Sequence, residues 1–217
     1  ANTKSYPGSG STWSDLSGNG NDVTLYNSPT FANDNGGCFD FNRTDSEYGL
    51  CSGIDDFDGN KVDISIATWF KSEVVNAYRY ILGFRDASSE GFFMLCLTNT
   101  SDRLECRAGT DSGYDDIGYP SSGDVDIASN FNNLCFTFNR SSNTISLYLN
   151  GEVVGTNTNA NGSDNWPADM GDFGICKAPY TTSLNGNGKM AIAFLYKKCL
   201  SAAEVKQNYD FHKERFE

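Results

Sequence analysis

The chain has 217 residues, of which 38% are hydrophobic and 13% aromatic, so it has enough apolar side chains to fold around a core. Its formal net charge of -12 at pH 7 repels phosphate backbones and anionic membrane surfaces, which argues against nucleic-acid partners. No run of about 18 apolar residues occurs, so membrane insertion is not expected. The length suits a single domain over residues 1–217, because β-sandwiches of this size commonly form one unit.

Turn-forming residues dominate the beginning of the chain. The stretch Ser14–Phe41 reads SDLSGNGNDVTLYNSPTFANDNGGCFDF and is rich in Gly, Asn, Ser and Pro. Glycine costs about 1 kcal/mol and proline about 3 kcal/mol inside a helix, whereas Asn and Ser favour turns. This stretch is therefore predicted to form loops that join short strands.

Apolar residues then fall at every second position, the spacing of a strand with one buried face. In KVDISIATWF, Val62, Ile64 and Ile66 share one face and Trp69 lies on the other. The segments YRYILGF, GFFMLCL and RLECRAG follow as further short strands.

The clearest pair of predicted strands spans residues 133–155. The alternating apolar positions are Leu134, Phe136 and Phe138 in the first strand, and Ile145, Leu147 and Leu149 in the second. The sequence RSSN between them predicts a turn. Asn150 and Gly151 predict another tight hairpin, because both residues tolerate positive φ.

The pattern changes near the C-terminus. The segment KMAIAFLYKKCL predicts a last long strand with Met190, Ile192, Phe194 and Tyr196 on one side. Ser201 and Glu204 then match a capping box, and Val205, Tyr209, His212 and Phe216 follow at helical spacing. Many short strands and one terminal helix predict an all-β fold: a two-sheet antiparallel β-sandwich with a short C-terminal α-helix.

The seven cysteines have no CxxC spacing and the chain has a single histidine, so a Cys/His zinc site is poorly supported. Cys96 and Cys106 flank a predicted turn, and a disulfide between them across a hairpin is one interpretation. Seven reduced, mostly buried thiols are the alternative.

Catalytic patterns are scarce. The only histidine, His212, falls on the helix face expected to dock on the sandwich, so we interpret it as structural. Glycoside hydrolysis needs two carboxylates facing the sugar bond, and none of the glutamates has an acidic partner two residues on in a strand-like run. The chain is therefore predicted not to be an enzyme.

Two loop regions and one isolated ring are candidate binding sites. Asp55, Asp56, Asp58 and Asn60 offer oxygen ligands around a glycine, which suits Ca²⁺, with an ordinary acidic turn as the alternative. In the second region, acidic residues alternate with tyrosines, and these side chains could bind a sugar through hydrogen bonds and ring stacking. The isolated ring is a tryptophan flanked by polar residues. These candidate ligand-binding residues are Tyr114, Asp115, Asp116, Tyr119 and Trp166. The alternative is that each ring packs its own loop.

Several segments together resemble the laminin-G-like, concanavalin-A-like lectin/glucanase superfamily. They are WSDLSGNGNDVTLYNSPTF, GGCFDF, ISIATWFK, NLCFTFNRSSNTISLYLNGEVVG and MAIAFLYKKCLSAAEVKQNY. The resemblance covers nearly the whole chain and implies a jelly roll that binds glycans or protein surfaces without catalysis, often with calcium at a rim. It is especially similar to modules on structural proteins of marine tailed phages and other aquatic viruses.

The resemblance carries two further expectations. Its relatives have an apolar strand before the position of Ala1, and they pair the first strand near the end of the last. The second property implies that Cys38 and Cys199 are neighbours that form a disulfide.

Together, the residues and the resemblance predict a recognition or adhesion module, extracellular or on a virion surface. Its expected partner is a glycan or cell-surface polysaccharide, and other virion or matrix proteins are alternative partners. An architectural virion decoration protein without a glycan ligand is the first alternative. A polysaccharide-cleaving enzyme is the second.

Overall fold

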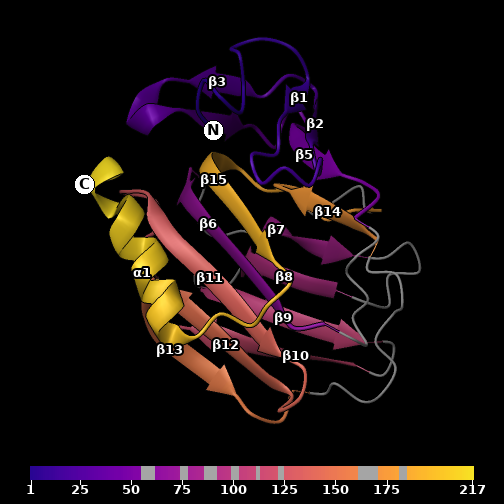
Figure 1. Cartoon of the computed structure of the whole chain (residues 1–217), viewed down its shortest axis with the longest axis vertical. Helices are drawn as coiled ribbons and strands as arrows, with labels where there is room; N and C mark the ends of the chain where they lie inside the picture. Colours follow the sequence, from indigo (N-terminus) through magenta and orange to yellow (C-terminus); the bar gives the residue numbers. More distant parts are fainter. Residues whose placement is uncertain are drawn as a thin grey trace.

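The computed structural model describes residues 1–54, 62–73, 78–85, 92–98, 103–110, 113–121, 125–160, 171–180 and 185–217. Two antiparallel sheets pack face to face, and one helix lies on the outside of the second sheet (Figure 1). The predicted antiparallel β-sandwich with a C-terminal helix is therefore confirmed.

The first sheet has eight strands. In spatial order they are β1 (Thr12–Trp13), β2 (Val23–Tyr26), β5 (Tyr48–Cys51), β14 (Asp172–Ile175), β7 (Arg79–Arg85), β8 (Phe92–Leu97), β9 (Leu104–Thr110) and β10 (Gly113–Tyr119). The strands adjacent in the sheet include pairs far apart in sequence, such as β5 with β14 and β14 with β7. The chain therefore crosses from one sheet to the other several times along its length.

The second sheet has seven strands. In spatial order they are β13 (Glu152–Asn157), β12 (Thr144–Leu149), β11 (Asn132–Asn139), β6 (Ile64–Ser72), β15 (Gly188–Tyr196), β4 (Cys38–Phe41) and β3 (Thr30–Ala32). Short 3-10 turns occur at Asp34–Gly36 and Lys213–Arg215.

The core lies between the sheets and is built from alternating residues, as predicted. The predicted apolar positions of β6, β11 and β12 pack in it: Ile64, Ile66, Leu134, Phe136, Phe138, Ile145 and Leu147 are fully buried, and Leu149 packs against them. Leu134 faces Leu149 and Phe138 faces Ile145 across the β11–β12 ladder, so the predicted hairpin is confirmed. Cross-strand apolar pairs of this kind stabilise a sheet and fix its register.

The second predicted hairpin is also present. Asn150 has φ 51° and Gly151 has φ 80°, and they join β12 to β13. Positive φ at both positions is the requirement that Asn-Gly meets.

The prediction for the last strand is wrong at one residue. The register of β15 against β6 shifts between Met190 and Ile192. Met190 therefore packs in the core between the sheets, whereas Ile192 packs in an outer cluster beside the helix. A β-bulge adds one residue to a strand and reverses the faces beyond it, so simple alternation could not place both residues correctly.

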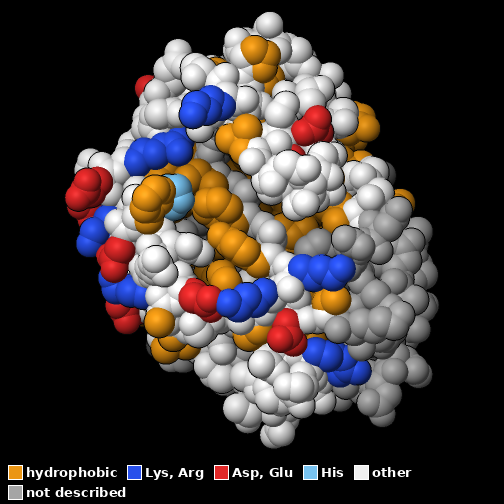
Figure 2. All heavy atoms as spheres, viewed as in Figure 1, with side chains coloured by type: hydrophobic (Ala, Val, Ile, Leu, Met, Phe, Trp, Pro, Cys, Tyr) orange, Lys and Arg blue, Asp and Glu red, His pale blue; other side chains and the backbone are white. Residues whose placement is uncertain are grey.

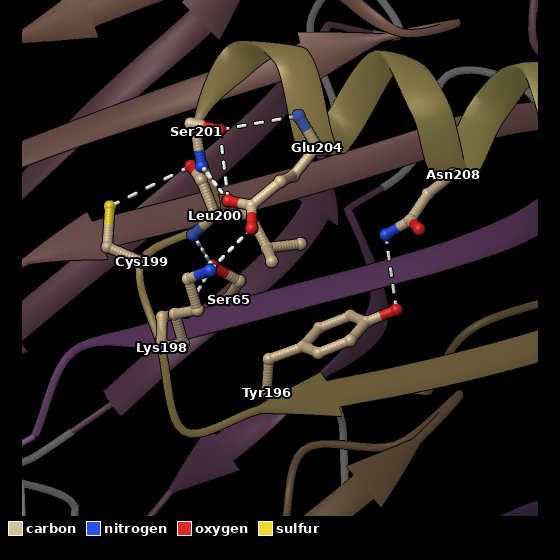
Figure 3. A network of polar contacts seen from close by, with 8 residues as sticks. All are labelled: Ser65, Tyr196, Lys198, Cys199, Leu200, Ser201, Glu204 and Asn208. Atoms are coloured by element: carbon tan, nitrogen blue, oxygen red, sulfur yellow. Dashed lines mark hydrogen bonds and ion pairs between the residues drawn. The ribbon is translucent and has the colours of Figure 1, made fainter.

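The helix α1 (Ala202–His212) begins with the predicted capping box (Figure 3). The Ser201 hydroxyl accepts a hydrogen bond from the Glu204 amide, and the Ser201 amide donates to the Glu204 carboxylate at 2.9 Å. Ser65 of β6 holds the preceding loop, because its hydroxyl donates to the Lys198 carbonyl at 2.6 Å and accepts from the Leu200 amide at 2.9 Å. These bonds fix where the helix starts on the outer face of the seven-stranded sheet.

Aromatic stacking holds the other end of α1. The ring of Trp69 stacks with the rings of Tyr209 and Phe216, and its centroid lies 5.6 Å and 4.2 Å from theirs. His212 packs against Phe194 at 5.6 Å between centroids. The helix face predicted to dock on the sandwich does so, and His212 has the structural surroundings expected of it.

Candidate functional site

The strands β8 and β9 place polar and sulfur-containing side chains on the outer face of the eight-stranded sheet. Leu104, Cys106 and Ala108 of β9 point into the core, so Glu105 and Arg107 between them point outward. Met94 and Cys96 of β8 belong to a separate outer cluster with Tyr80. We call Tyr78, Tyr80, Cys96, Glu105, Arg107 and Asp116 the outer-face cluster.

Glu105 and Arg107 form an ion pair at the centre of this cluster. The Arg107 Nε donates to Glu105 Oε2 at 2.7 Å, and Nη2 lies 2.5 Å from the same oxygen. Glu105 is only 4% exposed. Burial raises the pKa of Glu105, its hydrogen bond to Asp116 raises the pKa further, and Arg107 lowers it. The cluster thus holds two neighbouring carboxylates, stabilised by one guanidinium.

Aromatic rings and a thiol surround the ion pair. The Arg107 guanidinium lies 5.0 Å from the centre of the Tyr78 ring, within the range of a cation–π contact. The Cys96 thiol donates to Glu105 Oε2 at 3.8 Å, and burial raises the pKa of Cys96 to about 12, so it remains protonated. Tyr80 is fully buried, and within the described part of the chain its hydroxyl has no hydrogen-bond partner.

The structure does not bring the predicted acids and rings of residues 114–119 to one surface. Asp116 pairs with Arg107 in the β9–β10 ladder and lies beside Glu105. Asp115 instead accepts a hydrogen bond from Asn157 of β13 at 3.3 Å, and Tyr119 packs against the core. The backbone of Tyr114 lies in β10. Alternation along a strand sends neighbouring residues to opposite faces, which separates Asp115 from Asp116.

The remaining predicted site residues lie outside the described residues. They are the proposed calcium ligands Asp55, Asp56, Asp58 and Asn60, and the loop ring Trp166. In the part of the chain that is described, no group of three or more His, Cys, Asp or Glu side chains could hold a metal ion. The Ca²⁺ site stays a prediction.

Neither predicted disulfide is formed, and all seven cysteines are free thiols. Cys96 pairs with Glu105, whereas Cys106 pairs with Leu95. Adjacent rungs of a ladder face opposite ways, and Cys96 accordingly lies in the outer cluster and Cys106 in the core. The predicted hairpin exists, but the cysteines are one position out of register for a bridge.

Cys38 and Cys199 are also separated. Cys38 lies in β4 next to the start of β15, since its neighbour Phe39 pairs with Met190. Cys199 follows the far end of β15, and its electrostatic neighbour is Cys135 of β11. The length of β15 therefore separates the two thiols.

Four residues of the outer-face cluster were not among those predicted from the sequence: Glu105, Arg107, Tyr78 and Tyr80. The segment RLECRAG does contain a pattern that indicates the ion pair: a glutamate and an arginine lie two residues apart, with apolar residues between and around them. That spacing puts opposite charges side by side on one strand face. Their proximity to Asp116 depends on pairing with β10, which the sequence pattern did not identify.

The sequence matches the family described as the concanavalin A-like lectin/glucanases superfamily over residues 43–206, more than half of the chain. The chain belongs to this superfamily. No curated protein sequence matches the chain. This assignment confirms the family that the sequence segments resembled, and it agrees with the two-sheet fold of the structure.

Solved structures with the same fold include toxin binding domains. The binding domain of Paraclostridial Mosquitocidal Protein 1 superposes with TM-score 0.72 at 15% identity, over 92% of this chain and 49% of that one. The receptor binding domain of botulinum neurotoxin D superposes with TM-score 0.72 at 13% identity, over 91% and 49%. The botulinum neurotoxin serotype G binding domain gives 0.71 at 15% identity, over 91% and 48%. The chain spans about half the length of these proteins, and at such identities the likeness shows the fold alone.

Among the residues that the structure describes, every helix, α1 included, is too short or too polar to cross a bilayer.

Proposed function

We propose that this superfamily member is a non-catalytic recognition module that binds a glycan through the outer face of its eight-stranded sheet. The observation that carries the proposal is the outer-face cluster. Asp116 supplies acceptors for sugar hydroxyls, Arg107 supplies donors and Tyr78 supplies a ring, while the buried Glu105 holds Arg107 in place. A few convergent polar groups beside an aromatic surface are typical of sugar-binding sites.

The cluster is open to a ligand on the side of β10. Asp116 is exposed, Tyr78 is half-buried, and the Arg107 side chain is 21% exposed. Tyr80 and Cys96 lie beneath them and are fully buried. A ligand would therefore contact Asp116, Arg107 and Tyr78, while the buried residues fix their positions.

Fold and neighbours support the same proposal. The structural neighbours are named as binding or receptor-binding domains, and those names describe the toxins' own domains. For this chain we propose a glycan or cell-surface polysaccharide as partner and an extracellular or virion-surface location. Calcium bound by Asp55, Asp56, Asp58 and Asn60 would add a rim contact, in keeping with their oxygen-rich composition.

The test is binding of the labelled protein to a glycan array. The Asp116→Asn variant removes an exposed charge from the cluster, and we expect it to weaken binding about tenfold, the cost of one charged hydrogen bond. The matched control is Asp45→Asn, which changes an exposed aspartate in the turn between β4 and β5. Equal binding by both variants would contradict the proposed site.

Polysaccharide cleavage is a second candidate, because the raised pKa of Glu105 beside a second carboxylate is a feature of acid catalysts. The geometry favours binding instead. Glycosidases keep both carboxylates free to face the sugar bond between them, whereas Glu105 is only 4% exposed and is held by Arg107 at 2.7 Å. New reducing ends or unsaturated sugars from a polysaccharide panel, absent with Glu105→Gln, would support the enzyme.

A protein without glycan binding that decorates a virion or matrix is the third candidate. It would show neither array binding nor product release. Its partner would be another virion or matrix protein, and the charge of -12 favours a basic surface.

A further inference from the structure

Two tyrosine rings stack on the outer face of the eight-stranded sheet, near one of its edges. Tyr26 of β2 pairs with Tyr48 of β5, and their rings lie parallel, with an interplanar angle of 6° and centroids 4.6 Å apart. Leu25 and Cys51 of the same two strands pack in the core, so alternation directs both tyrosines outward. Directly opposite aromatic side chains stabilise a ladder, and here they also fix the orientation of both rings.

A lysine covers one end of this stack. The Lys177 ammonium lies 3.9 Å from the centre of the Tyr48 ring, within the range of a cation–π contact. Lys177 follows β14, which borders β5 on the side away from β2. The ring of Tyr48 is therefore held between a cation and the ring of Tyr26.

The other end of the stack is open. The β1–β2 ladder pairs Thr12 with Thr24, and the same antiparallel register continued by two residues puts Gly10 opposite Tyr26. Glycine has no side chain to lie on the ring, and a β-carbon at Gly10 would meet no described atom within 4 Å. Tyr26 is accordingly 39% exposed. A flat ring that is supported from behind and open in front is a surface for a ligand with an apolar face.

The groups around this ring select the class of ligand. The phenol hydroxyls of Tyr26 and Tyr48 and the Lys177 ammonium add hydrogen-bonding groups beside the aromatic face. A pyranose has C–H groups on its faces and hydroxyls at its rim, so it matches a ring bordered by polar groups. When all hydroxyls are equatorial, as in β-linked glucose, both faces are free to stack. The charge of -12 repels acidic and sulfated sugars, which favours a neutral one.

The tyrosine stack and the outer-face cluster lie on one line across the sheet. Ladder partners lead along this line from the neighbour of Tyr48 in β5 to the ion pair in β9. The positions on the line are Gly49, Ile175, Leu82, Tyr80, Cys96 and Glu105. Because β14, β7 and β8 lie between β5 and β9, four strand spacings of about 4.8 Å separate the two sites, about 19 Å in all.

We propose that Tyr26 stacks a neutral pyranose and forms a second subsite of the glycan-binding face, so that the ligand is an extended chain of β-linked, equatorial sugars laid across the strands. One end of the chain lies on the Tyr26 ring, and the other end lies against the outer-face cluster. That both ends belong to one glycan rests on the proposed function. The stacking subsite rests on the Tyr26–Tyr48 pair alone.

The probe is cellohexaose, a chain of six β-linked glucose units, and its affinity is measured by titration calorimetry. Tyr26→Ala removes the open ring, and we expect it to weaken binding about tenfold, the effect of losing one aromatic stacking contact. Tyr26→Phe keeps the ring and should retain most of the affinity. Cellobiose is too short to reach both sites, so it should bind at least about tenfold more weakly than cellohexaose.

Phe211→Ala is the matched control. It also removes an exposed ring, since Phe211 is 81% exposed, but it changes α1 on the outside of the other sheet. Figure 2 shows that side of the molecule, where hydrophobic side chains lie around the single histidine, His212, whose ring contacts Phe211. This variant should bind cellohexaose like the parent protein. Thermal unfolding of each variant confirms that it is folded.

The outcomes separate this inference from the proposed function. Weaker binding by both Tyr26→Ala and Asp116→Asn supports a chain that spans the two sites. Weaker binding by Tyr26→Ala alone supports the stacking subsite and contradicts the outer-face cluster. Weaker binding by Asp116→Asn alone overturns the subsite and leaves the proposed function intact. Equal affinity for cellobiose and cellohexaose, or no measurable binding of either, would also overturn the inference, whereas the glycan array tests the proposed function independently.

Discussion

Replacing Arg107 with methionine tests whether the ion pair organises the outer-face cluster. The substitution keeps an unbranched apolar stem but leaves Glu105, which is 4% exposed, without its guanidinium and beside Asp116. Removing one partner of a buried ion pair costs about 3–5 kcal/mol, and the lower end applies because the Arg107 side chain is 21% exposed. A loss of about 3 kcal/mol lowers the melting temperature by about 6–12 °C in a chain of this length.

The assay is thermal unfolding of the parent protein, Arg107→Met, Glu105→Gln and the double variant at pH 7. The double variant should recover most of the loss, because it no longer buries an unpaired charge. An unchanged melting temperature for Arg107→Met, or an equal loss in the double variant, would refute the reasoning.

We also expect the stability difference between the parent protein and Arg107→Met to depend on pH. The pKa of Glu105 is raised above its ordinary value of 4.5, first by burial and then by Asp116. A carboxyl with a raised folded-state pKa contributes stability that is fully present below the ordinary pKa and is lost as pH rises through the folded pKa. The difference between the parent protein and Arg107→Met should therefore shrink near pH 4 and widen toward pH 7. A difference that is constant across this range would show that Glu105 does not carry the effect.

Three further predictions concern the fold. Under native conditions a thiol reagent should modify Cys199 first, because the other six thiols are buried. After unfolding it should modify all seven cysteines, and an intact mass with fewer than seven modified thiols would reveal a disulfide. Ser201→Ala should lower the unfolding free energy by about 1 kcal/mol through loss of the helix cap, and an unchanged urea midpoint would contradict this. Gly83→Ala should lower the free energy of unfolding by about 3 kcal/mol, because Gly83 has φ 154° and an added β-carbon would lie 2.1 Å from the Phe93 carbonyl oxygen. A variant as stable as the parent protein would contradict the close approach of β7 and β8.

Periodicity predicted the parts of this fold that depend on local patterns. The alternating residues of β11 and β12 pair in the expected register, and the capping box at Ser201 begins the helix. Both features follow from residues close in sequence. The faces of β15 beyond Met190 were not predicted, because a bulge changes the alternation without a clear sequence mark.

The candidate site depended on pairing that sequence patterns did not identify. Glu105 and Arg107 share a strand, but Asp116 comes from β10 and Tyr78 precedes β7. The residues from Tyr114 to Tyr119 were predicted to form one loop cluster, whereas they form a strand that separates Asp115 from Asp116. Acids and rings in a turn-rich sequence do not by themselves distinguish a loop from an edge strand.

The most direct test of the recognition module is the hydrogen-exchange footprint of a glycan identified on the array. The proposal predicts slower exchange at the backbone amides of β9 and β10 around Arg107 and Asp116. Protection confined to the opposite sheet would show that glycan recognition does not use the outer-face cluster.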